Sequence, residues 1–143
     1  YTAKVAGTEA GITEPTLTFS TCFGAPFLPL PPKVYGDLLK EKIRSLGAKV
    51  WLINTGWTGG KYGVGERISL KLTRRMVTAA LNGELDEVEY STHPIFGLQV
   101  PKSCPDVPFH VLDPKSTWAN AEEYDVLASE LQGRFEKNFQ SFV

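Results

Sequence analysis

The sequence predicts an α/β fold of the mixed α+β type, on three observations. A short apolar run at residues 49–54 leads into a glycine-rich loop and then a helical pattern, which is the strand, loop, helix order of α/β proteins. Two further stretches, residues 32–46 and 120–142, carry apolar side chains at helical spacing. Short runs rich in strand-forming residues predict additional strands. With 42% hydrophobic residues among 143, the chain is long enough for one domain with a core.

The first thirty residues carry few periodic signals. The chain opens at Tyr1 with a pattern that predicts the last turns of a helix ending at Gly7. Six residues cannot nucleate a helix alone in water, so we expect the end of a longer element; the alternative is a removed tag or a frayed terminus. Residues 8–32 predict a long loop with a short strand at 16–20. Three aromatic side chains recur there and are expected to anchor the loop to a core that this chain contains only in part: Phe19, Phe23 and Phe27.

Two helices have clear start and stop signals. A Pro-Pro pair opens the helix at residues 32–46 and Gly47 closes it. The second helix begins near Ser69, after the glycine-rich loop, and stops at Asn82 and the glycine that follows. The apolar stripes are Val34, Tyr35, Leu38, Leu39, Ile43 and Leu46 in the first helix, and Leu72, Met76, Val77, Ala80 and Leu81 in the second.

The last third of the chain predicts two strands and a long helix. The strands are expected at residues 88–92 and 96–100, and residues 107–112 have an extended pattern. Asn120, with Glu123 three positions later, forms a variant capping box that predicts the start of the helix. The apolar positions of that helix are Tyr124, Leu127, Leu131, Phe135, Phe139 and Phe142.

Charge and composition exclude several classes of partner. The formal net charge of −1 predicts no general affinity for nucleic acid or for anionic membranes. Positive charge is nevertheless concentrated after the glycine-rich loop, which suits a small anion: Lys61, Arg67, Lys71, Arg74 and Arg75 accompany a single acid, Glu66. No apolar run approaches the length of a membrane span. The two cysteines, Cys22 and Cys104, lack metal-ligand spacing and predict the reduced thiols of a cytoplasmic protein.

Five glycines occur within ten residues of the loop: Gly56, Gly59, Gly60, Gly63 and Gly65. The loop fails the test for a phosphate-binding loop of the Walker type, because Thr55 stands where the first glycine belongs and Tyr62 where Ser or Thr must hold a metal ion. It also lacks the third glycine of the dinucleotide fingerprint. Two readings stay open, a ligand-binding loop and a structural turn.

Three residues after the loop have the chemistry of a nucleoside site. Arg67 stands at the entrance of the second helix, where the helix dipole favours anions and electron-rich atoms. Ile68 offers an apolar edge for a flat base, and Thr73 offers a hydroxyl for polar ring or ribose atoms. The alternative is that Thr73 caps or bonds back to its own helix and that Arg67 forms a surface ion pair.

Other candidates are weaker. Cys22 could act as a nucleophile with His93 or His110 as its base, but nothing near Cys22 supplies an activating charge. Glu9 and Glu14 lie in a glycine-flanked loop, where carboxylates are usually solvated. The three tryptophans are expected to pack rather than to form a stacking platform: Trp51, Trp57 and Trp118.

Several long motifs resemble one family throughout the chain. They are YTAKVAGTEAGITEPTLTFSTCFGAPFLPL, NTGWTGGKYGVGERI with the following Thr73-Arg74, HPIFGLQVP, LDPKSTW and YDVLASELQGRFEKNF. Together they resemble the C-terminal part of ATP-dependent phosphoenolpyruvate carboxykinase. The resemblance implies an enzyme of gluconeogenesis that converts oxaloacetate and ATP to phosphoenolpyruvate, ADP and CO2 with Mg²⁺ or Mn²⁺. It also implies that Arg67, Ile68 and Thr73 contact ATP on its nucleoside side.

The resemblance further implies that this segment holds no catalytic group and no metal ligand. We expect residues 1–143 to be a single fragment of the C-terminal mononucleotide-binding domain, with the phosphate loop and the N-terminal domain in the remainder of the same polypeptide. The expected ligands are oxaloacetate and ATP, and the fragment alone is expected to be inactive. The alternative functions are a non-catalytic nucleotide- or anion-binding module, or a purely structural segment.

Overall fold

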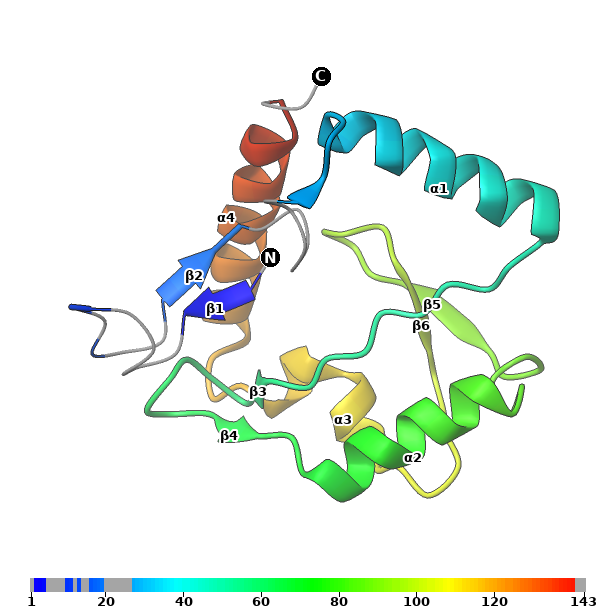
Figure 1. Cartoon of the computed structure of the whole chain (residues 1–143). Helices are drawn as coiled ribbons and strands as arrows, with labels where there is room; N and C mark the ends of the chain where they lie inside the picture. Colours follow the sequence, from blue (N-terminus) through cyan, green and yellow to red (C-terminus); the bar gives the residue numbers. More distant parts are fainter. Residues whose placement is uncertain (1, 5–9, 12, 14–15, 20–26, 141–143) are drawn as a thin grey trace. The chain divides into compact units, whose positions relative to one another are not determined.

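The computed structural model describes residues 2–4, 10–11, 13, 16–19 and 27–140 (Figure 1). The chain divides into two units, one of residues 1–50 with 135–143 and one of residues 51–134. Each unit combines helices with small two-stranded antiparallel sheets, so the mixed α and β composition predicted from the sequence is confirmed. Across the described residues, no helix is both long and apolar enough to cross a bilayer.

The first unit begins with a strand where the sequence predicted a helix end. β1 (Thr2–Lys4) pairs antiparallel with β2 (Thr16–Thr18), in the register Thr2 to Thr18. The expected helix end is therefore wrong, because inter-strand pairing with β2 satisfies the backbone groups that so short a helix would leave unpaired. The strand expected at residues 16–20 is confirmed in β2.

α1 (Pro32–Leu46) follows the predicted start and stop signals closely. Gly47 adopts the left-handed conformation at φ 61°, and its N–H donates to the carbonyl of Ile43, which ends the helix. No residue of α1 is buried, and Leu46 at its end is 76% exposed. The helix is thus defined by its local signals, while its apolar stripe remains open among the described residues.

The aromatic anchors expected in the N-terminal loop are only partly confirmed. Phe19 packs edge-on against Phe135 of the last helix, with ring centroids 5.4 Å apart. Phe27 is 85% exposed, so it does not pack into a core formed by the described residues, and its role as an anchor stays a prediction. Phe23 lies outside the described residues.

The strand predicted at residues 49–54 is not formed. Residues 49–54 belong to no sheet of the described residues, and an apolar run becomes a strand only through backbone hydrogen bonds to a neighbouring strand. β3 (Trp57–Thr58) and β4 (Glu66–Arg67) instead enclose the glycine-rich loop as an antiparallel hairpin. We call residues 57–67 the ribbon.

α2 (Leu70–Leu81) begins and ends as the sequence predicted. The Ser69 side chain accepts a hydrogen bond from the N–H of Leu72 at 3.3 Å, which caps the helix. Asn82 is the C-cap residue, and the following glycine has φ 73°.

The segment after α2 contains the two expected strands and one unexpected helical turn. β5 (Tyr90–Thr92) pairs antiparallel with β6 (Gln99–Pro101). The extended pattern expected at 107–112 is wrong: α3 (Phe109–Leu112) is helical, because an N-cap proline precedes it and its carbonyl accepts from Val111 N at 3.0 Å. The 3₁₀ helix η2 (Pro114–Thr117) follows.

α4 (Ala121–Gln140) begins with only half of the predicted capping box. The Asn120 Oδ1 accepts from the N–H groups of Glu122 and Glu123, at 2.9 and 3.3 Å. The carboxylate of Glu123 does not reach back to Asn120 but pairs with Lys61 of the ribbon. Of the predicted apolar positions, Phe142 lies outside the described residues.

The core of the second unit joins α2 to the segments that follow it. Its buried members are Ala79, Leu85 and Cys104, and Met76, Val88, Val107, Leu112 and Trp51 are among the partly buried side chains packed against them. Because α2 contributes to this core, the orientation of its first turns is fixed within the unit.

Candidate functional site

The ribbon presents two faces with different surroundings. Trp57 is the cross-strand partner of Arg67, and Thr58 is the partner of Glu66. Directly opposed residues of an antiparallel pair share one face of the sheet, and successive residues alternate. We therefore distinguish an outer face, Trp57 and Arg67, from an inner face, Thr58 and Glu66. Both outer-face side chains are exposed, Trp57 to 42%. On the inner face Thr58 is half-buried and Glu66 is exposed.

Two of the loop glycines are required by the turn itself. A Cβ on Gly65 would lie 2.5 Å from the Gly60 carbonyl oxygen and 2.6 Å from that of Thr58, which no side chain tolerates. Gly59 adopts φ 77°, a left-handed conformation that favours glycine. Close backbone approach within the ribbon thus accounts for these glycines without a ligand.

The other two predicted residues follow the ribbon, Ile68 just before the N-cap Ser69 and Thr73 in α2. Ile68 is half-buried, and its N–H donates to the Gly56 carbonyl at 2.9 Å, which continues the hairpin toward the helix. Thr73 is half-buried one turn into α2, and its N–H donates to the Ser69 carbonyl at 3.0 Å. Ser69, not Thr73, caps the helix. Thr73 therefore keeps its hydroxyl free of the capping role that the alternative reading gave it.

The basic residues after the loop divide into paired and unpaired groups. Lys61 pairs with Glu123 at 2.8 Å, and Arg75 pairs with Glu84 and Asp106. Within the described part of the chain, no ion pair involves the remaining three, which are Arg67, Lys71 and Arg74. The alternative reading of Arg67 as a surface ion pair thus finds no partner among the described residues. The positive charge of these three side chains lies just before α2 and in its N-terminal half, where the helix dipole adds to it.

Arg75 is a structural residue rather than a free cation. Its Nη1 and Nη2 donate to the two carboxylate oxygens of Glu84, and its Nε donates to Asp106 Oδ2 at 3.1 Å. These hydrogen bonds raise the pKa of Arg75, and the pKa of the Glu84 carboxyl is lowered by Arg75 first and Asn82 second. The hollow on this side of α2 is lined by Lys71, Leu72, Arg74, Arg75, Thr78 and Asp106.

His93 is committed to a turn and is not placed as a catalytic base. Its Nδ1 accepts from the backbone N–H groups of Ile95 and Phe96, both at 3.3 Å. Since Nδ1 is the acceptor, Nε2 carries the proton and donates to Tyr124 Oη at 2.9 Å. Burial raises the pKa of Tyr124, with smaller contributions from Asp113 and Asp125. The proposed nucleophile Cys22 lies outside the described residues, as do Glu9 and Glu14, and His110 is exposed on α3.

The remaining sulfur and indole groups separate packing residues from exposed ones. Cys104 is buried, and desolvation raises the pKa of its thiol, so it is a poor nucleophile. Trp51 packs near Tyr90 and Trp118 near Tyr124, as the sequence predicted. Trp57 is different: it stands edge-on to Tyr62 at 5.5 Å on the exposed side of the ribbon, across from Arg67.

The exposure of Trp57 beside Arg67 was not predicted from the sequence, because all three tryptophans were expected to pack. The signal was available, since a hairpin closed around the loop brings the residue before it opposite the residue after it.

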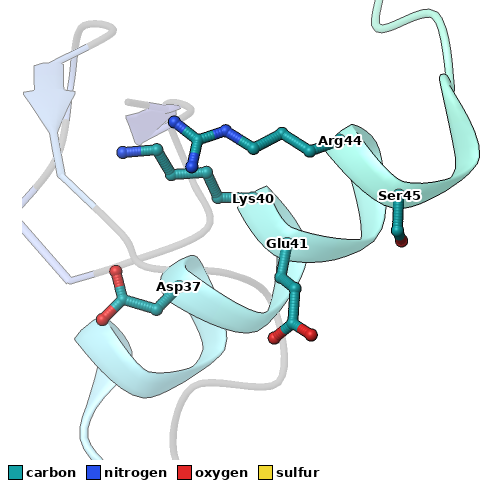
Figure 2. A pocket seen from close by; sticks show the side chains of 5 residues that line it. All are labelled: Asp37, Lys40, Glu41, Arg44 and Ser45. Atoms are coloured by element: carbon teal, nitrogen blue, oxygen red, sulfur yellow. The ribbon is translucent and has the colours of Figure 1, made fainter.

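α1 carries a separate shallow hollow of mixed charge (Figure 2). The side chains that line it are Asp37, Lys40, Glu41, Arg44 and Ser45. Lys40 and Arg44 extend to one side of the helix and Glu41 and Ser45 to another. Both signs of charge alternate on one helix, which is the pattern of a solvated face rather than of a binding site.

Comparison with known proteins identifies the family of the chain. The family described as phosphoenolpyruvate carboxykinase matches residues 1–110. The chain is 61% identical over 142 residues to phosphoenolpyruvate carboxykinase (ATP) of Caldanaerobacter subterraneus subsp. tengcongensis and 58% identical to that of Flavobacterium johnsoniae. Phosphoenolpyruvate carboxykinase (ATP) 1 of Moorella thermoacetica is 59% identical. The chain belongs to the phosphoenolpyruvate carboxykinase (ATP) family. The resemblance drawn from the sequence motifs is confirmed.

The carboxykinase relatives are much longer than this chain. Each alignment covers 99% of the chain and 27% of the relative. Among the described residues of this chain, no group of three or more His, Cys, Asp or Glu side chains could hold a metal ion. The described residues therefore offer no complete set of such ligands for the divalent cation that the family resemblance implies.

Proposed function

We propose that this chain forms part of the ATP nucleoside pocket of a phosphoenolpyruvate carboxykinase that converts oxaloacetate and ATP to phosphoenolpyruvate, ADP and CO2 in gluconeogenesis. The observation that carries the proposal is the position of Arg67, exposed on the outer face of the ribbon at the entrance to α2 and without an ion pair among the described residues. The relatives' names, which include ATP, support it.

Each of the three residues has a separate task in this proposal. Arg67 donates hydrogen bonds to electron-rich atoms of the nucleoside, aided by the positive end of the α2 dipole. Ile68 contributes apolar contact to the base. Thr73, one turn along α2, supplies a hydroxyl that both donates and accepts. Their role is to bind and orient ATP, since phosphoryl transfer depends on positioning and on charge neutralisation.

The chemical groups of the reaction belong, in this proposal, to the rest of the polypeptide. The segment is a fragment of the C-terminal mononucleotide-binding domain, and the phosphate loop, the ligands of Mg²⁺ or Mn²⁺ and the catalytic groups lie elsewhere in the same chain. Oxaloacetate contacts none of the described residues. The free thiol of Cys104 supports a cytoplasmic location.

The test uses Arg67→Ala in a polypeptide of the relatives' length. We expect the KM for ATP to rise, with a loss of about 1.5–3 kcal/mol of binding free energy for ATP. The KM for oxaloacetate should stay nearly unchanged. Arg44→Ala, an exposed arginine on α1, is the matched control and should change neither constant. An unchanged KM for ATP in Arg67→Ala would remove Arg67 from the site.

A second candidate is a non-catalytic nucleotide- or anion-binding module. Three side chains favour it, because they concentrate positive charge before and within the first turns of α2 and form no ion pair with another described residue: Arg67, Lys71 and Arg74. ATP should then raise the melting temperature of the 143-residue chain, since a ligand that binds only the folded form stabilises it. Carboxykinase turnover is expected to be absent from this chain alone, and measurable phosphoenolpyruvate formation would contradict that expectation.

A further inference from the structure

The inner face of the ribbon is fastened to the segment that leads into α4. Thr58 Oγ1 lies 3.3 Å from Thr117 Oγ1 in a half-buried contact between residues 59 positions apart. A Cβ on Gly59 would lie 3.4 Å from the Thr117 carbonyl oxygen, so the ribbon backbone rests directly on η2. Lys61 Nζ lies 2.8 Å from Glu123 Oε1. Three ribbon positions thus contact one short segment, residues 117–123.

The hydroxyl of Thr117 has a fixed role in this contact. Its single proton is donated to the Pro114 carbonyl at 2.7 Å, which leaves Thr117 Oγ1 as the acceptor. Thr58 must therefore donate to Thr117. The direction of the bond follows from η2, not from the ribbon, so Thr117 is a preset acceptor that holds Thr58.

Glu123 is available for Lys61 because Asn120 caps α4 on its own. The Asn120 Oδ1 accepts from both Glu122 and Glu123 backbone N–H groups, so the carboxylate is not needed for the cap. Glu123 stands in the first turn of α4, where the helix dipole stabilises a negative charge. The ion pair is exposed, and its contribution is small, as for other surface pairs.

The consequence concerns the other face of the ribbon. Because Thr58 and Arg67 lie on opposite faces of a two-stranded sheet, fixing the inner face fixes the direction in which Arg67 points. We propose that Thr117 and Glu123 are positioning residues of the nucleotide site: they hold the glycine-rich ribbon against α4 so that its outer face is presented to ATP. This inference rests on the proposed nucleoside role of Arg67.

A charge-reversal cycle in a polypeptide of the relatives' length tests the proposal. Lys61→Glu and Glu123→Lys should each raise the KM for ATP by about two- to fivefold, with kcat and the KM for oxaloacetate little changed. The double variant should return the KM for ATP to within about twofold of the original, because the pair is restored with its charges exchanged. If Lys61 instead contacted ATP itself, the double variant would not recover, and the proposal would be overturned.

Two controls separate positioning from general structure. Lys115 pairs with Asp125 at 2.6 Å with similar exposure, and among the described residues no ion pair joins either side chain to the ribbon, so reversing that pair should leave the KM for ATP unchanged. Thr117→Val should raise the KM for ATP, whereas Thr117→Ser keeps the acceptor and should not. Equal effects of the two Thr117 variants would overturn the role of the hydroxyl.

Hydrogen exchange on the 143-residue chain tests the tether without ATP. Amides of residues 59–65 should exchange faster in Glu123→Lys and regain their protection when Lys61→Glu is added. No change in exchange would overturn the tether. If Arg67→Ala left ATP binding intact while this exchange cycle behaved as expected, the proposed nucleoside site would fail and the tether would stand. If Arg67→Ala weakened ATP binding but the KM cycle showed no recovery, the positioning role would fail alone.

Discussion

α1 and α2 are two helices with equally clear sequence signals and different surroundings. Both begin and end where capping residues predict, Gly47 after one and Ser69 before the other. α2 buries Ala79 completely in the core of its unit, whereas α1 buries none of its residues. The comparison shows that local signals set the bounds of a helix, while burial depends on other segments of the chain.

The charges of the two helices differ in the same way. Arg75 of α2 joins Glu84 and Asp106, 9 and 31 residues away in the sequence. The ion pair of α1 is local, between Lys33 and Asp37 four positions apart. Interactions between distant segments define a tertiary structure, whereas a pair within one helix only supports that helix.

Truncating a side chain in the core beside α2 should lower the free energy of unfolding far more than truncating one on α1. Leu85→Ala empties a position that is only 4% exposed, and we expect the free energy of unfolding to fall by about 2–4 kcal/mol. Leu46→Ala, at the exposed end of α1, should change it by less than about 0.5 kcal/mol. Urea denaturation followed by circular dichroism measures both. Equal losses would show that α1 is covered after all.

The Arg75 contacts should give a smaller and pH-dependent effect. Arg75 and then Asn82 hold the pKa of Glu84 below its ordinary value of 4.5, so this carboxylate stabilises the fold above that pH. Its contribution is lost as the pH falls through the lowered pKa of the folded state. Glu84→Gln should therefore be less stable than the original chain at pH 7, and the gap should narrow in acid. Melting temperatures between pH 7 and pH 3 measure it, and a constant gap would contradict the assignment.

Tyr124 should show the opposite pH dependence. Burial, first, and the neighbouring aspartates raise its pKa, so the neutral phenol stabilises the fold below the unfolded value of about 10, and that contribution is lost as the pH rises further. Tyr124→Phe removes the acceptor of His93 Nε2 and should cost about 0.5–1.5 kcal/mol at pH 7. The cost should shrink above pH 10 in alkaline denaturation experiments. Nitrogen NMR of the original chain should find the proton of His93 on Nε2.

Removing the local ion pair of α1 should have the smallest effect on stability. Lys33 and Asp37 are both mostly exposed, and their contact at 2.7 Å spans one helical turn. Lys33→Ala should leave the melting temperature of the chain unchanged within error, because water solvates both groups well. A clear fall would indicate that α1 is held by more than its caps.

The helices could be predicted from the sequence because their signals are local. The bounds expected for α1 and α2, and the Asn120 cap of α4, match the structure within a residue or two. The strands were harder to predict. The run at 49–54 has strand-forming composition but belongs to no sheet of the described residues, while residues 2–4 looked helical and became a strand by pairing with β2. Pairing between distant segments decides such cases, and composition does not contain it.

The residues of the candidate site could be selected from the sequence, but the contacts that hold the ribbon could not. Arg67, Ile68 and Thr73 were selected from the helix entrance and the family motif, and their role in binding remains a prediction. The choice of Glu123 between Asn120 and Lys61 depends on a neighbour 62 positions earlier in the sequence, which no local pattern reveals. The exposure of Trp57 likewise follows from the hairpin register rather than from its residue type.

The buried thiol of Cys104 offers a way to watch the second unit open. It lies in the core beside Ala79 and Leu85, and burial raises its pKa, so an alkylating reagent can modify it only when that core transiently unfolds. In a Cys22→Ser background, the modification rate at increasing reagent concentration would count those openings directly. The alkylation rate would then report how often the core opens in the unit to which the ribbon belongs.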